Sequence, residues 1–181
     1  MTTFDDAALL SAWRSHEDLV EVLSRAVRAL NRVIDDAEVG RAARATREQA
    51  WALGGSLVKL EGAFGVLKHA WRRVPEAPGA RQELVSLNEE LDQARAHLER
   101  RLEQLGARGS DAPGTVALLE AALVELQRPL QQALRRAHAI LVELLPRLES
   151  EPSDDPDWEG VVESALELAP ALSARIKPDG S

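Results

Sequence analysis

Residues 116–148 read VALLEAALVELQRPLQQALRRAHAILVELLPRL, and this stretch decides the fold class. Its apolar side chains recur at steps of three or four residues. Only an α-helix brings residues with that spacing onto one face. The sequence therefore predicts a long helix whose leucine-rich stripe consists of Val116, Leu119, Leu123, Leu126, Leu130, Leu134, Ala137, Leu141, Leu144 and Leu148.

The same spacing continues through most of the chain. It predicts three more long helices and a shorter C-terminal helix, with short connections that favour antiparallel neighbours. The expected fold is all-α: an antiparallel bundle of four long helices (two long helical hairpins), with the fifth helix packed across it or against a second copy. The helices are expected over residues 6–35, 46–74 (or from 40), 80–105, 110–149 and 156–175.

A stretch rich in Pro, Ser and Asp separates the last helix from the rest, as linkers do. We therefore expect a helical bundle over 1–149, a linker over 150–157, an acidic C-terminal helix over 158–176 and a frayed tail over 177–181. Residues 149–181 hold nine acidic and two basic residues, so their net charge is −7, and the rest of the chain carries −1. A nearly neutral body does not attract phosphate backbones at long range, which disfavours a nucleic-acid partner.

The sequence also bears on location. It has no cysteine, so it holds neither a disulfide framework nor a thiolate metal site. Its uncharged runs reach about ten residues, whereas a membrane-spanning helix needs about 20 apolar residues. Asp5 and Asp6 stand where a secretory signal would carry positive charge. We expect a cytoplasmic protein without a transmembrane segment.

The sequence gives little sign of catalytic or metal chemistry. Its histidines, at positions 16, 69, 97 and 138, lack the acidic residue three positions earlier that metal-binding bundles carry. The segment 54–58, GGSLV, lacks the second glycine of the GxSxG nucleophile motif. We therefore expect no catalytic residue, no metal and no cofactor, and we expect His16 to be a hydrogen-bonded core residue.

The helix expected over 46–74 contains four glycines, at positions 54, 55, 62 and 65. Each costs a helix interior up to about 1 kcal/mol relative to alanine, so a structural reason is expected. Small residues would allow another helix of the same chain to pack closely, form a surface for self-association or another protein, or leave a ligand pocket. The candidate interaction surface consists of Trp51, Gly55, Val58, Gly62, Gly65 and His69.

Trp158 completes this candidate surface. It lies in the acidic C-terminal helix, where its large ring would anchor that helix either to the bundle or to a partner.

The long, wide apolar stripes predict a non-enzymatic interaction or scaffold protein that acts through protein–protein contacts. The expected partner is a second copy, giving a homodimer, or another protein. One alternative is an amphipathic coat on a hydrophobic or membrane interface. The polar faces disfavour it, because they mix both signs of charge instead of being rich in Lys and Arg. A second alternative is a nucleic-acid-associated regulatory bundle that uses Arg72–Arg73 and Arg100–Arg101.

Overall fold

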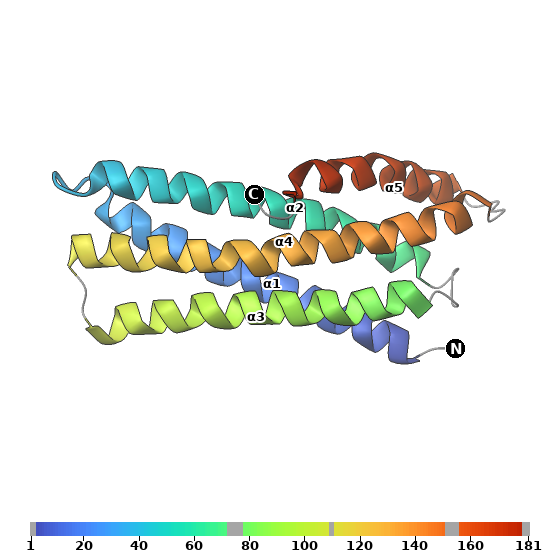
Figure 1. Cartoon of the computed structure of the whole chain (residues 1–181), viewed down its shortest axis with the longest axis horizontal. Coiled ribbons are helices and arrows are strands. Elements are labelled where there is room, and N and C mark those ends of the chain that lie inside the picture. The colour runs from blue at the N-terminus through green and yellow to red at the C-terminus, as the bar shows by residue number, and fades with distance from the viewer. Residues whose placement is uncertain (1–2, 72–77, 109–110, 151–155, 179–181) are drawn as a thin grey trace.

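The computed structural model describes residues 3–71, 78–108, 111–150 and 156–178. Over these ranges the chain forms helices and no strands, which confirms the all-α prediction. The helices are α1 (Thr3–Val33), α2 (Gly40–Ala70), α3 (Pro78–Arg108), α4 (Ala112–Ser150) and α5 (Pro156–Arg175) (Figure 1).

Three helix starts differ by two or three residues from the sequence-based boundaries: α1 begins at Thr3, α3 at Pro78 and α4 at Ala112. α2 begins at Gly40, the earlier of its two possible starts. α3 begins at Pro78, two residues before its expected start at Ala80. Proline suits a first helical turn because the N–H it lacks would have no acceptor within the helix there. The expected end of α2 near Val74, most of the expected linker and the last three residues of the tail lie outside the described residues.

α1 to α4 lie lengthwise beside one another, and α5 packs on the outside of this body (Figure 1). Its neighbours are α2 and α4. Polar contacts fix the relative position of α1 and α2. His16 contacts Leu57, and Arg47 contacts Asn31, so the paired residues run in opposite order along the two helices.

The core is almost entirely aliphatic. All ten residues of the α4 stripe are buried, as the spacing predicts. α4 also stays helical through Pro129 and Pro146, although each proline removes one backbone hydrogen bond. Phe64 is the largest fully buried side chain, and its ring packs edge-on against Trp13. Burial of this apolar surface is the main force that holds the helices together.

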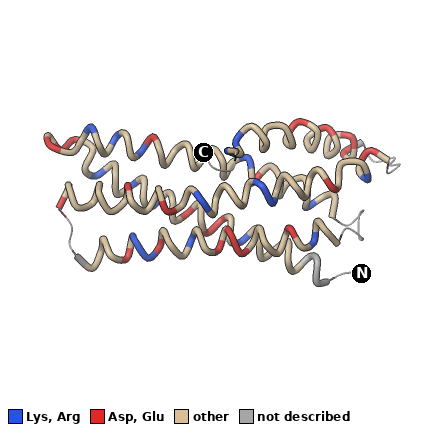
Figure 2. The backbone as a smooth tube through the Cα atoms, in the orientation of Figure 1, with Lys and Arg blue, Asp and Glu red and all other residues tan. Residues whose placement is uncertain are grey.

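The described parts of the chain include no helix that is both long and apolar enough to cross a membrane. Acidic residues gather along α5, whereas α1 to α4 carry both signs of charge (Figure 2).

Candidate interaction surface

The candidate residues on α2 lie along two edges of this helix, one that borders α5 and one that borders α1. Gly55 and Gly62 face α5 of the same chain. A Cβ atom at Gly55 would lie 2.9 Å from a guanidinium nitrogen of Arg175, and one at Gly62 would lie 3.3 Å from a methyl carbon of Leu168. On this side the small residues therefore admit a helix of the same chain, which was the first of the three possibilities.

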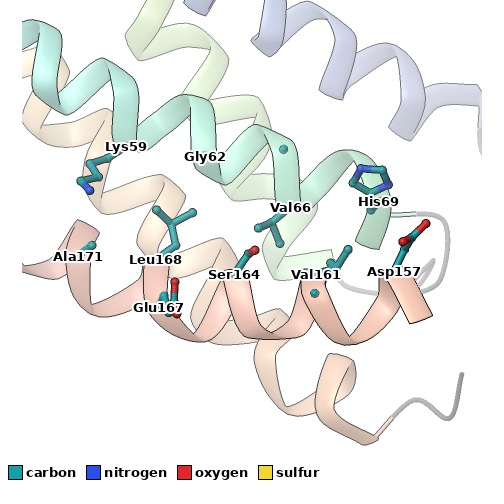
Figure 3. Close-up of a pocket in the computed structure, with 12 residues that line it drawn as sticks. Lys59, Gly62, Val66, His69, Asp157, Val161, Ser164, Glu167, Leu168 and Ala171 are labelled. Carbon is teal, nitrogen blue, oxygen red and sulfur yellow. The ribbon is translucent and has the colours of Figure 1, made fainter. Parts of the chain in front are cut away.

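Around Gly62 and Leu168, α2 and α5 border an open hollow of about 690 Å³, which we call the α2–α5 hollow. Gly65 and His69 line it from α2, and nothing lies within 4 Å of a Cβ atom at Gly65. Figure 3 shows His69 and Asp157 at one end of the hollow and Lys59 towards the other. Both helices thus contribute charged groups, so the lining lacks a uniform chemical character.

Trp51 and Val58 are exposed on α2 where this helix borders α1. Trp51 is 54 % exposed and Val58 is 62 % exposed. Together with α1 they border a second hollow of about 470 Å³. We call this surface the α1–α2 face, and it comprises Val20, Leu23, Val27, Trp51, Gly54 and Val58.

The exposed Trp51 ring is held in place by its own helix. The guanidinium carbon of Arg47 lies 4.5 Å from the centre of the indole ring, a cation–π contact. Arg47 also donates a hydrogen bond from Nη1 to Oδ1 of Asn31 on α1, at 2.8 Å. Trp51 is therefore presented to solvent by an arginine that is itself tied to the neighbouring helix.

Trp158 lies inside the molecule. Its side chain is 5 % exposed and belongs to the hydrophobic core together with Ala165, Ala169 and Leu172 of α5. Of the two roles considered for Trp158, the structure places it in the first, as the anchor of α5 to the bundle.

His16 is buried in the core, as expected. Its Nε2 donates to the backbone oxygen of Leu57 at 2.8 Å, and its ring packs against Phe64. Within the described ranges, no three His, Cys, Asp or Glu side chains come close enough to hold a metal ion.

Shifted pKa values occur at Arg95 and Arg101 of α3 and at Glu125 of α4, and these residues line neither hollow. A hydrogen bond from Arg101 holds the pKa of Glu125 below its usual range. This hydrogen bond to Glu125 raises the pKa of Arg101, and a hydrogen bond to Asp92 raises the pKa of Arg95.

The contribution of α1 to the α1–α2 face escaped the sequence analysis. The helical spacing of Leu9, Trp13, His16, Val20, Leu23, Val27, Leu30 and Ile34 predicts one apolar stripe on the first helix. The prediction is wrong for Val20, because its side chain is 40 % exposed. α1 carries two adjacent apolar stripes, and both supply core residues, Leu23 and Leu30 from the stripe of Val20 and Leu19 and Ala26 from the other, so Val20 is left at the edge of the core. That excess of apolar surface was the available signal.

Comparison with known proteins adds no relative: the chain matches no protein-family model, no curated protein and no solved structure.

Proposed function

We propose that this chain is a non-enzymatic protein-interaction bundle that binds its partner through the α1–α2 face. One observation carries this proposal: three exposed apolar side chains, Trp51, Val58 and Val20, border the same hollow. Single exposed apolar residues are ordinary, whereas a contiguous group around a depression is typical of an interaction site.

The shape of the face supports a protein partner. Gly54 contributes no side chain, and a Cβ atom there would lie 3.9 Å from a methyl carbon of Leu23 on the floor. A partner's apolar side chain can therefore enter between Trp51 and Val58. A tryptophan beside such a depression matches the residue type that most often dominates binding energy in protein interfaces.

The chemistry of the lining also favours binding over catalysis. Glu61 is the charged residue among the described residues that line this hollow, and the others are apolar or small apart from Ser24. Removing water from an apolar lining lowers the free energy, and a partner's apolar surface that covers the lining removes this water.

A site-specific photocrosslinker tests the proposal. A benzoyl-phenylalanine would replace Val58 in one protein and Val124 in a matched control. Val124 is a valine on α4 with 56 % exposure, close to that of Val58. We expect irradiation in the native host to give adducts of discrete mass from position 58 and none of them from position 124.

The same adducts should disappear when Trp51→Ser is added to the position-58 protein. Equal adduct patterns from positions 58 and 124, or adducts that survive Trp51→Ser, would contradict the proposed function.

A further inference from the structure

We propose that the partner at the α1–α2 face is a second copy of this chain, and that the two α2 helices cross there in opposite directions about a two-fold axis near Gly54. This inference rests on the proposed function, because it requires the α1–α2 face to be a binding surface. Its basis is the distribution of charge around the apolar centre.

On α2, two residues of opposite charge stand at equal distances on either side of Gly54. Arg47, Trp51, Gly54, Val58 and Glu61 follow steps of 4, 3, 4 and 3, so they share one side of the helix. Arg47 and Glu61 each stand seven residues from Gly54, or about 10 Å along the axis. When two such helices cross in opposite directions, Arg47 of each copy faces Glu61 of the other, and each Trp51 faces a Val58.

α1 repeats the same polarity. Glu17, Glu21 and Arg28 are exposed and lie, with Ser24, along one side of this helix at steps of 4, 3 and 4. The contacts His16–Leu57 and Asn31–Arg47 set the register between the helices. These contacts place Arg28 toward the Arg47 end of the face, Glu21 level with Gly54 and Glu17 level with Leu57. α1 therefore adds a basic residue at the Arg47 end and acidic residues from the centre onward, in the same sense as the Arg47-to-Glu61 order on α2.

This polarity selects both the partner and its direction. A two-fold dimer uses the same surface twice, so that surface must complement itself. Crossing in opposite directions brings the acidic end of each copy onto the basic end of the other. The alternative two-fold arrangement, with the axis along the helices, would place the two acidic ends together and cost free energy by repulsion.

The centre of the face also suits a crossing point. Gly54 carries no side chain, which lets another backbone approach closely. Arg47 can keep its bond to Asn31 and still donate to a carboxylate of the second copy, because its guanidinium carries five N–H donors.

Charge reversal tests the pairing on the full chain. We expect sedimentation equilibrium to show a two-chain mass for the wild type. Arg47→Glu and Glu61→Arg, each alone, should weaken self-association by about tenfold or more, since each change turns two attractions into repulsions. An equimolar mixture of the two variants should recover the two-chain mass, because every pair in the mixed dimer is again opposite in charge.

Matched controls are Arg128→Glu and Glu120→Arg, which make the same charge changes at exposed positions of α4. Circular dichroism melting would check that each variant is folded. Arg47 has contacts within the chain, so the exposed Glu61 provides a second, independent variant. A single-chain mass for the wild type at all concentrations would overturn the proposal, as would a mixture that fails to recover, or controls that weaken association equally.

The two proposals fail in different ways. If the wild type stays a single chain while a crosslinker at position 58 captures a different protein, the second-copy inference fails and the proposed function stands. If the wild type forms a two-chain species that the charge variants leave unchanged, the crossing geometry fails. If position 58 gives no specific adduct, both proposals fail.

Discussion

Glycines lie beside apolar residues along both edges of α2, but α5 covers one edge, whereas large apolar side chains stay exposed on the other. On one side Gly55 and Gly62 lie against α5. On the other, Gly54 lies between the exposed side chains of Trp51 and Val58. Small residues beside apolar ones thus indicate a surface that can pack closely against another helix. Which helix packs there depends on the tertiary arrangement of the chain.

The largest expected difference between the two sides lies in their tryptophans. Trp158→Ala should lower the free energy of unfolding by about 3–5 kcal/mol, because it empties a buried site in the α5 anchor. Trp51→Ala should change it by about 0.5 kcal/mol or less, because the ring is exposed. Urea denaturation at low protein concentration measures both values and keeps any self-association out of the comparison.

Similar losses for the two variants would break this comparison. A large effect of Trp51→Ala would mean that its contact with Arg47 is part of the fold, and a small effect of Trp158→Ala would mean that α5 holds to the bundle by other contacts.

The C-terminal end of α5 provides the second prediction. Gln131 of α4 donates from Nε2 to the backbone oxygen of Arg175 at 3.0 Å and accepts from the backbone N–H of Lys177 at 2.8 Å. Gln131→Ala should remove both bonds and lower stability by about 1–2 kcal/mol. Hydrogen exchange of the amides near Arg175 should accelerate.

The control is Gln127→Ala, about one turn earlier on α4 and exposed. We expect it to leave exchange near Arg175 unchanged. Equal exchange in both variants would show that the end of α5 is held by its other contacts, among them the hydrogen bond from Arg135 to the backbone oxygen of Lys177.

The sequence predicts the bundle but only part of the candidate surface. Buried leucines such as Leu134 recur over many turns, so periodicity identifies the α4 core directly. The partner of each glycine depends on tertiary packing, which spacing along one helix does not encode. Val20 illustrates the same limit of prediction from spacing. The apolar face of α1 is wider than the core, so the spacing does not tell which of its edges is exposed to solvent.

Glycine-to-alanine changes sharpen the comparison on the α5 side. Gly65→Ala should raise stability by up to about 1 kcal/mol, because helix propensity improves and a Cβ atom meets nothing within 4 Å. Gly62→Ala should gain less, since its Cβ atom would lie 3.3 Å from Leu168 and that side chain must shift. Thermal unfolding of the two single variants measures the difference.

Equal gains at both positions would mean that Leu168 moves aside without cost. The close contact with α5 would then not explain why residue 62 is a glycine.

The smallest expected effect concerns an exposed ion pair within the chain, Arg101 of α3 with Glu125 of α4. It is the counterpart of the pair that we propose between Arg47 and Glu61 of two copies. The pKa of Glu125 lies below its ordinary value near 4.5, chiefly because of the hydrogen bond from Arg101. A lowered pKa in the folded state means that this contribution to stability is present above pH 4.5 and lost as the pH falls through the folded pKa.

Glu125→Gln should therefore lower the urea midpoint slightly at pH 7 and leave it unchanged at a pH where both proteins carry a neutral side chain at position 125. Added salt should shrink the difference at pH 7, since exposed charges are screened. Glu120→Gln, also exposed on α4, provides the control. A difference that persists in acid would assign the effect to packing. In that case exposed ion pairs on this chain would contribute too little to orient two copies, and self-association would depend on Trp51 and Val58 alone.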